Sequence, residues 1–550
     1  MHCVRWVLVI GWLVLIVSLF YDPISHYLTD PNNSLSPFKD LAINRASDPS
    51  QCVKVQGECL VDEPYPMGTR IFWGMVVPSC IAIVFILGHE TWRRICPLYF
   101  LSQIPRALGL KPRLKIQKNL WLRKNHFYLQ FALLFIGVNC RILFINSARP
   151  VFGIFLLCTI LSAILVVFLY GGRSWCHYVC PFAIVQTVFT GPRGLLGSEA
   201  HKAPPRNITQ SACRTIDKAT GKEVPTCINC KNPCLDIDAE KSYWEHLKQP
   251  SRRLVQYGYL GLVSGYFVYY YLYSGNFDYY FSGAWTHEQN QLETIFKPGL
   301  YLFSHPINIP KLIAVPLTLA LFVAISCWIC AYIEKTIFSY MKRRNPDISR
   351  ELVVHKVFSI CTFLAFNTFY IYGGRPEIMR LPTLAQLIFN GLVVLVSALW
   401  LERTWNRSSE EYLQEAVADK LRRQIQKLSS KQGLNISQFL GGRSLEKLKP
   451  EELYVLAKVL PGVRQQNLEQ MYAEVLKEAL EERRFKPAES KEALDRLRQT
   501  QGISDLDHDR ILTEVLGKNP EIIKLSTQEP SCPTTRVSIS SLGISQFTEK

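Results

Sequence analysis

The chain has 550 residues, which is enough for two or three domains, and 48% of them are apolar. The apolar residues are concentrated before about residue 405, whereas the remainder is charged and follows a helical pattern. The formal net charge of +17 lies largely in loops between apolar runs, and this placement indicates membrane topology rather than a nucleic-acid-binding face. Nucleic acid is therefore excluded as a partner.

Eight apolar runs approach the roughly 20 residues that a helix needs to cross a bilayer. The first has no small-residue cleavage site after its apolar core, so we interpret it as a retained helix rather than a signal peptide. The sequence thus predicts a mainly α fold, a polytopic membrane helix bundle embedded in the lipid bilayer. Its expected spans are 4–20, 71–88, 127–145, 151–170, 254–273, 312–333, 357–372 and 384–401.

The charges in the loops predict the orientation of this bundle. The loop between the second and third spans carries nine Lys or Arg against one acid, whereas residues 21–70 carry four against seven. Because basic loops stay in the cytoplasm, eight spans place both termini there, and we expect a bacterial-type inner membrane protein. Cys52 and Cys59 then lie in the outer segment, where we expect a structural disulfide.

A partial Cys-Pro element follows the second span at Cys96, and a fuller one follows the fourth span at Cys176 and Cys180. Aligning Cys96 with Cys180 without a gap places Trp92 where Cys176 stands, so the earlier copy lacks one thiolate. Each copy follows a span that ends on the cytoplasmic side, which suggests a duplicated helix pair. Either Cys96 supplies a ligand to the later site or its own copy has lost a cluster.

The fuller element is followed by Cys213 and by a Cys-x2-Cys-x3-Cys run at Cys227, Cys230 and Cys234. This spacing is typical of ferredoxins, in which short loops let thiolates converge on irons while main-chain N–H groups turn toward the sulfides. Residues 171–250 are therefore predicted to form a cytoplasmic, cysteine-rich iron–sulfur loop.

Two other interpretations of these cysteines are open. Four of the thiolates could hold a structural zinc ion, because Cys-x2-Cys is equally a zinc-knuckle spacing, and the protein would then be a zinc-stiffened membrane scaffold. A disulfide framework is less favoured, because thiols on the cytoplasmic side of a membrane are usually kept reduced.

Three features of the remaining spans each have two interpretations. The tyrosines near the outer end of the fifth span fit an interfacial belt, or they line a path for electrons or quinone. Cys327 and Cys330 in the sixth span are either a redox dithiol or small buried residues. His89, His126 and His355 mark span ends and could hold a haem in pairs, but none lies deep in an apolar run, so haem is disfavoured.

Beyond residue 403 the pattern predicts amphipathic helices separated by glycines, without a catalytic constellation. A docking or regulatory bundle is the default interpretation. The expected helices are 410–428, 450–460, 465–484, 490–500 and 507–516. The expected domains are 1–70 (first membrane helix and outer loop), 71–402 (bundle), 403–525 (a soluble cytoplasmic helical domain at the C-terminal side) and 526–550 (a disordered tail).

The run from Gly172 to Pro181 resembles a family of membrane-bound ferredoxins. That family includes accessory proteins of nitrous-oxide reductase, the quinol-oxidising ferredoxin of periplasmic nitrate reductase, and the copper reductase that assists cytochrome oxidase assembly. The resemblance covers roughly residues 71–234 and implies a multi-span protein whose cytoplasmic [4Fe–4S] sites pass electrons at the membrane. The chain lacks two complete Cys-x2-Cys-x2-Cys-x3-Cys-Pro runs and an evident flavin-attachment domain, which leaves cluster number and electron acceptor open.

Spacing and resemblance together predict a membrane-bound iron–sulfur electron-transfer protein that exchanges electrons with quinone or a partner oxidoreductase. A [4Fe–4S] cluster would be bound by Cys227, Cys230, Cys234 and either Cys180 or Cys176, and the remaining thiolates, with Cys96 and Cys213, are candidates for a second site. The alternative is a sensor in which loss or oxidation of an exposed cluster signals through the C-terminal helices. No residue is assigned a catalytic role, because an electron carrier or oxidoreductase component is favoured over a stand-alone enzyme.

Overall fold

The computed structural model describes residues 2–30, 33, 52–60, 64–114, 116, 119–197, 214–216, 223–225, 238–288, 290–346, 348–432, 440, 443–459, 465–481 and 487–518. The chain forms two compact units. The first comprises Met1–Ser198, Ala212–Cys227 and Glu245–Asn406, and the second comprises Glu199–Ser211, Ile228–Trp244 and Arg407–Lys550.

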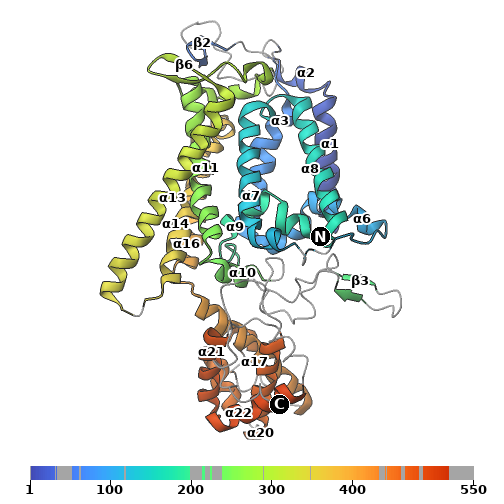
Figure 1. The fold of residues 1–550 in the computed structure, drawn as a ribbon, viewed down its shortest axis with the longest axis vertical. Helices are drawn as coiled ribbons and strands as arrows, with labels where there is room; N and C mark the ends of the chain where they lie inside the picture. Colours follow the sequence, from blue (N-terminus) through green and yellow to red (C-terminus); the bar gives the residue numbers. More distant parts are fainter. Residues whose placement is uncertain are drawn as a thin grey trace. The chain divides into compact units, whose positions relative to one another are not determined.

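Eight long helical rods make up most of the first unit (Figure 1). Successive rods run in opposite directions, so the start of the first and the end of the last lie at the same end of the bundle. The rods are α1 (His2–Phe20), α3 (Met67–Ile71) continued by η2 (Phe72–Val76) and α4 (Val77–Ile95), α7 (Leu120–Cys140) continued by η4 (Arg141–Ile145), α8 (Arg149–Tyr170), α11 (Pro250–Ser274), α13 (Lys311–Arg344), α14 (Arg350–Asn367) continued by η12 (Thr368–Gly373), and α16 (Thr383–Trp405).

Seven of these rods are long and apolar enough to cross a membrane, which confirms a mainly α, polytopic bundle. The exception is α11, although it has 25 residues and lies among α7, α13 and α14. Six of its seven tyrosines are buried, and only Tyr271, at 40% exposure, faces outward. The interpretation of these tyrosines as an interfacial belt is therefore wrong: their rings pack inside the protein, where the phenols lower the hydropathy of a central helix.

Glycines allow α11 to pack closely against α13. A Cβ atom at Gly261 would lie 2.4 Å from the Phe322 carbonyl oxygen, and one at Gly265 would lie 2.8 Å from the Phe322 Cβ. Small residues at such positions let two helix backbones approach each other, and the van der Waals packing that results is one of the forces that associate helices in lipid.

We expect Gly261→Ala to destabilise the bundle by roughly 2 kcal/mol, because the added methyl group meets main-chain atoms that cannot rotate away. The measurement is the thermal unfolding of the purified protein in detergent, followed by intrinsic fluorescence. Gly137→Ala on α7 is the matched control, since a Cβ there meets no atom within 4 Å. Equal unfolding temperatures for the two variants would contradict the close contact.

Short elements cap the two ends of the bundle. The helical ones are α2 (Ser25–Thr29), α5 (Pro97–Ser102), α6 (Ile104–Ala107), η5 (Trp175–Val179), α9 (Phe182–Thr190), α12 (Asp278–Phe281), η10 (Ala284–Thr286), η11 (Gln291–Thr294) and α15 (Arg375–Ile378). The strands form antiparallel pairs: β1 (Lys54–Val55) with β2 (Glu58–Cys59), β3 (Arg214–Ile216) with β4 (Glu223–Pro225), and β5 (Pro298–Leu302) with β6 (His305–Pro310). Cys52 and Cys59 form a disulfide beside the first pair, as predicted.

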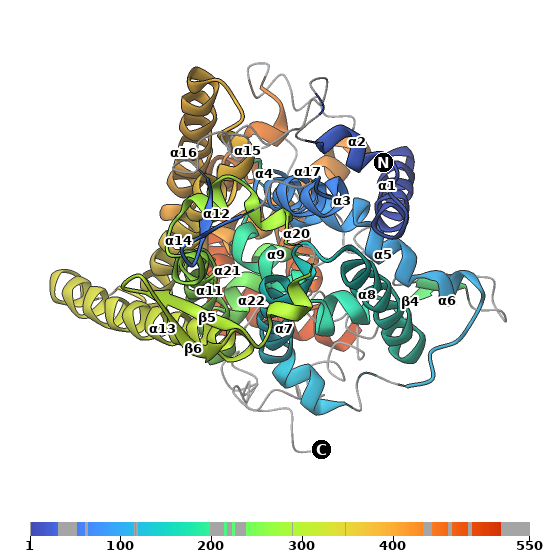
Figure 2. The same ribbon diagram turned by 90° about the horizontal axis from the view of Figure 1, so that it is seen from above.

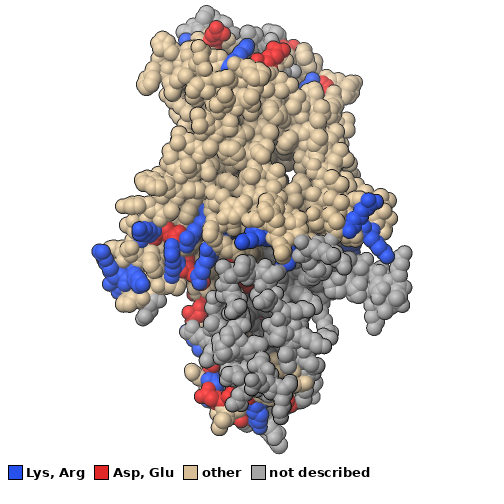
Figure 3. Space-filling view, viewed as in Figure 1, with Lys and Arg blue, Asp and Glu red and all other residues tan. Residues whose placement is uncertain are grey.

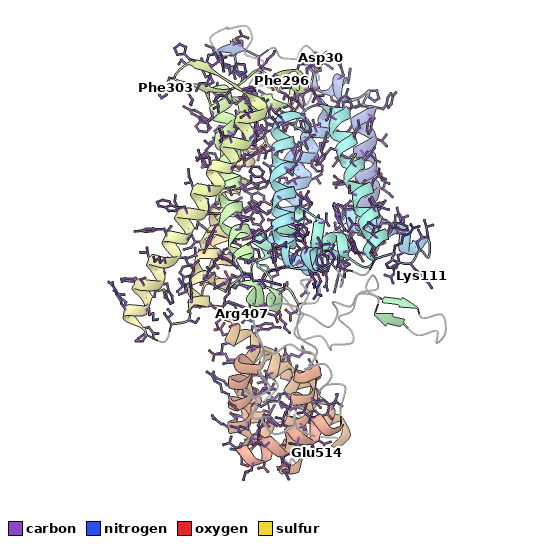
Figure 4. All side chains as sticks on the ribbon, viewed as in Figure 1. Asp30, Lys111, Phe296, Phe303, Arg407 and Glu514 are labelled. Atoms are coloured by element: carbon purple, nitrogen blue, oxygen red, sulfur yellow. A yellow bond between two sulfur atoms is a disulfide. The ribbon has the colours of Figure 1, made fainter. Side chains whose placement is uncertain are left out.

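Charge divides the surface of the first unit. On the face seen in Figure 3, Lys and Arg gather at the end where α1 begins and α16 ends, and a broad band without charged residues separates them from the opposite end. Lys111 lies at this basic end, whereas Asp30, Phe296 and Phe303 lie at the opposite end (Figure 4). A bilayer accommodates an uncharged band of this kind, because it contains no water to solvate charged side chains.

The second unit is helical. Its described elements are α17 (Ser409–Gln432), η13 (Leu445–Lys447), α19 (Pro450–Val459), α20 (Gln465–Glu481), α21 (Pro487–Gln501) and α22 (Asp505–Lys518), together with most of α10 (Ala239–His246). The five helices predicted from periodicity are confirmed, with ends that differ by a few residues. Their apolar faces form the core, in which Leu421, Leu453 and Tyr472 are fully buried. The predicted tail, 526–550, lies outside the described residues.

Candidate metal centre

The two Cys-Pro elements have the same backbone course. Gly88 (φ 76°, ψ 173°) and Gly171 (φ 73°, ψ 179°) each interrupt the end of a membrane helix with torsions that only glycine adopts readily. Cys96 (φ −54°, ψ 117°) and Cys180 (φ −55°, ψ 119°) then turn the chain into the short helices α5 and α9. The duplicated helix pair suggested by the sequence is therefore present in the structure.

The gapless alignment of the two copies is wrong by one residue. The Cys96 N–H donates to the Trp92 carbonyl, four residues back, at 3.0 Å, whereas the Cys180 N–H donates to the Trp175 carbonyl, five residues back, at 2.8 Å. Trp92 therefore corresponds to Trp175. The second copy carries one additional residue as the π-helical turn η5, a feature that is frequent at functional sites. When the two copies are aligned at Trp92 and Trp175, Cys176 of the second copy corresponds to Arg93 of the first.

Each copy braces the other. The short helix α9 of the second copy packs on α4, and α5 of the first copy packs on α8. After α9 the chain passes the break at Gly88, where the Leu195 N–H donates to the Phe85 carbonyl at 2.9 Å. After α6 it passes the break at Gly171, where the Leu114 N–H donates to the Leu169 carbonyl at 2.7 Å. Main-chain carbonyls near each break thus find partners in a segment from the opposite copy.

This bracing brings three predicted site residues together. Cys180 is buried, Cys96 and Cys176 are half-buried, and Leu98 of the first copy packs in the same apolar cluster as Cys176 and Cys180. Burial raises the pKa of the Cys180 thiol, and the neighbouring Cys176 and Cys96 raise it further, because each disfavours another negative charge nearby. A thiolate in this place needs a positive partner, such as a metal ion.

Arginine supplies positive charge beside these thiols. The Arg173 side chain is 2% exposed, donates from Nη2 to the Arg93 carbonyl at 3.2 Å, and lies 4.0 Å above the Tyr99 ring. It also interacts electrostatically with Cys96. Sequence reasoning missed this residue, because nothing in the motif distinguishes a buried arginine from one at the membrane surface.

The residues present fit an iron–sulfur cluster in charge and in hydrogen bonding. Thiolates ligate such clusters, which carry net negative charge and accept N–H···S hydrogen bonds. Trp92 and Trp175 have buried indole N–H groups without a partner among the described residues, so each copy holds a donor suited to sulfur. The fit is incomplete in number, because a [4Fe–4S] cluster takes four protein ligands and the described part of the chain brings no three His, Cys, Asp or Glu to metal-binding distance.

Four predicted site residues, Cys213, Cys227, Cys230 and Cys234, lie outside the described residues. Their assignment stays a prediction.

One cysteine of the sixth span contacts a cysteine of the next span. Cys330 on α13 has its sulfur 3.7 Å from that of Cys361 on α14, and both residues are buried. Of the two interpretations of Cys327 and Cys330, the burial of Cys330 agrees with the small buried residue, and its sulfur contact is made with the neighbouring helix. No spacing rule in the sequence joins residues 31 positions apart.

The histidines at the span ends have main-chain partners in two cases. His355 Nε2 lies 2.7 Å from the Thr404 carbonyl oxygen, and His126 Nδ1 lies 3.0 Å from that of Arg123. His89 is buried near the first glycine break.

Residues 152–198 match the family model of a 4Fe-4S binding domain. No curated protein and no solved structure matches the chain. The matched segment comprises α8, η5 and α9, with Cys176 and Cys180 at its centre and Cys158 on α8. The chain therefore carries a ferredoxin-type domain for a [4Fe–4S] cluster, and this segment by itself contains fewer cysteines than the cluster has ligand positions.

Proposed function

We propose that this protein is a membrane-bound iron–sulfur electron carrier that works at the cytoplasmic face. The observation that supports it best is that Cys96 of the first copy lies near Cys176 and Cys180 of the second, and the latter two belong to a segment that matches a 4Fe-4S binding domain. A zinc-stiffened scaffold would need neither this match nor the duplicated glycine breaks.

The thiolates of Cys176 and Cys180 bind iron in this proposal, and Cys96 with the later cysteines completes the ligand set. When bound, a [4Fe–4S] cluster takes up and returns one electron at a time. Arg173 stabilises the added negative charge, and the buried Trp92 and Trp175 limit access of water. Low dielectric and a fixed cation together set the reduction potential.

We propose the cytoplasmic face because of where the basic residues of the bundle lie. The basic end of the bundle carries Lys and Arg in the segment that precedes α7 and in the last turn of α13, and basic segments of this kind are retained in the cytoplasm. Both termini of the first unit's helix bundle then lie on that side. We propose a quinone or a partner oxidoreductase as electron donor or acceptor, since both reach a site at the membrane surface.

One experiment tests cofactor, activity and face together. Sealed membrane vesicles containing the full chain are prepared without air, in right-side-out and inverted orientations. A membrane-impermeant reductant of low potential is expected to bleach the visible iron–sulfur absorption and produce an EPR signal only in inverted vesicles, and reoxidation is expected to restore the colour.

Two other results would contradict the proposal. Reduction confined to right-side-out vesicles would overturn the proposed face. Colourless vesicles, or zinc in place of iron, would overturn the electron-carrier function and favour the scaffold.

A second candidate function is a redox sensor, and contacts within the second unit favour it. Asp238 follows Cys234 by four residues and accepts a hydrogen bond from the Tyr412 hydroxyl at 2.6 Å. Arg407 forms ion pairs with both Glu240 (2.7 Å) and Glu415 (2.6 Å), and Figure 4 labels it at the start of the segment Arg407–Lys550 of this unit. The downstream end of the cysteine loop is thus held by the C-terminal helices. Irreversible loss of colour on oxidation, with altered proteolysis of these helices, would favour the sensor.

A further inference from the structure

A pocket of about 600 Å³ opens between α11, α13 and the start of α14. It lies where α13 extends away from α11 toward one side of the bundle, as Figure 2 shows from above. Leu254, Ala331 and Phe338 contribute apolar walls, and Arg253, Lys335 and Arg350 contribute charged ones. The pocket therefore combines two kinds of surface that one amphipathic ligand could satisfy.

Glu334 organises the charged side of the pocket. Its side chain is 4% exposed, accepts hydrogen bonds from the Tyr257 hydroxyl (2.9 Å) and Arg350 Nη2 (3.1 Å), and forms an ion pair with Arg253 Nη2 (3.1 Å). A buried carboxylate held by three donors has little capacity left for another cation.

Positive charge exceeds negative charge here. Three cationic side chains, Arg253, Lys335 and Arg350, surround the single carboxylate of Glu334, so three charges less one leave a surplus of two. Within the described residues, Arg253 Nε is buried without a hydrogen-bond partner, and no ion pair involves Lys335. A buried donor that lacks an acceptor, beside a surplus of positive charge, points to an anionic ligand.

The position of the pocket along α13 indicates which class of anion it binds. Its α13 residues run from Cys327 to Ser339 and so end shortly before the basic run Lys342–Arg344 with which that helix ends. In a helix that crosses a bilayer, this level is where lipid phosphates lie. The apolar walls continue toward the uncharged part of α13, where acyl chains lie.

We propose that this pocket binds an anionic phospholipid, with its phosphate on Arg253, Lys335 and Arg350 and an acyl chain along Leu254, Cys327 and Ala331. Basic pockets between membrane helices are the form that such recognition takes. The proposal is independent of the electron-carrier function, because it uses none of the cysteines of the metal centre.

The test measures binding of phosphatidylglycerol, phosphatidylcholine and inorganic phosphate to the purified full-length protein, by native mass spectrometry and by thermal stabilisation. We expect phosphatidylglycerol to bind more tightly than phosphatidylcholine. Lys335→Gln is expected to weaken the binding of phosphatidylglycerol about fivefold, the effect of one basic residue near a charged membrane surface.

Arg343→Gln is the matched control, because Arg343 is exposed on the same helix but does not line the pocket. Lys335 is itself exposed, so its substitution is not expected to disturb folding, and Arg350→Gln provides a second variant. Equal binding of the two lipids, or equal effects of Lys335→Gln and Arg343→Gln, would overturn the proposal. Binding of inorganic phosphate that displaces the lipid completely would assign the pocket to a soluble anion instead.

Discussion

Cys180→Ser is expected to remove most of the iron from the protein, starting from about four irons per cluster, and with it the visible absorption and the EPR signal of the reduced state. Serine offers a hard oxygen ligand with a much higher pKa than a thiol, so it seldom replaces thiolate at iron–sulfur clusters. Cys180 is the most buried of the three neighbouring thiols, Cys96, Cys176 and Cys180, and water has little access there to replace the missing ligand. The measurement is iron content and EPR of anaerobically purified protein.

Cys158→Ser is the matched control for this substitution. Cys158 lies in the same matched segment, but it is exposed on α8, where in the membrane it would face lipid. The two variants therefore differ in the position of the lost thiol and not in its chemistry. Retention of full iron content by Cys180→Ser would show that the ligands come from elsewhere, and loss of iron in Cys158→Ser would place the cluster within the membrane region.

Gly171→Ala is expected to destabilise the protein by roughly 3 kcal/mol or more, through two additive causes. The torsions of Gly171, φ 73° and ψ 179°, belong to a region that is open almost only to glycine. In addition, a Cβ atom there would lie 2.4 Å from Pro112 Cγ, in the segment that returns over the break. We expect a lower unfolding temperature and, since the break precedes Cys176, weaker retention of iron during purification.

Gly88→Ala separates the two causes. Gly88 has nearly the same torsions, but the nearest atom to a Cβ there is Gly194 N at 3.6 Å, an ordinary contact. This variant should show the conformational strain without the clash, and so a smaller loss of stability. Equal unfolding temperatures for the two variants would contradict the close approach of Pro112 to Gly171.

Hydrophobicity and periodicity were enough to predict the helices. Seven spans and the five helices of the second unit follow from local patterns, because each needs only its own residues to form an apolar rod or an amphipathic face. The disulfide of Cys52 and Cys59 could be predicted as well, because its two cysteines are only seven positions apart in the sequence. The eighth rod, α11, was predicted correctly as a long helix, but the surroundings of its tyrosines were not.

The sequence by itself determined the helical architecture and the presence of a duplicated Cys-Pro element, and it favoured an iron–sulfur cofactor over zinc, because span length and thiol spacing are local properties. Only the tertiary structure decided that Trp92 corresponds to Trp175, that Arg173 is buried beside Cys96, and that Cys330 meets Cys361. The physical reason is the same in each case. A π-helical turn shifts the register of a helix without leaving a signature in the sequence. Contacts between helices depend on how the rods pack, and that packing is determined jointly by residues that are far apart in the chain.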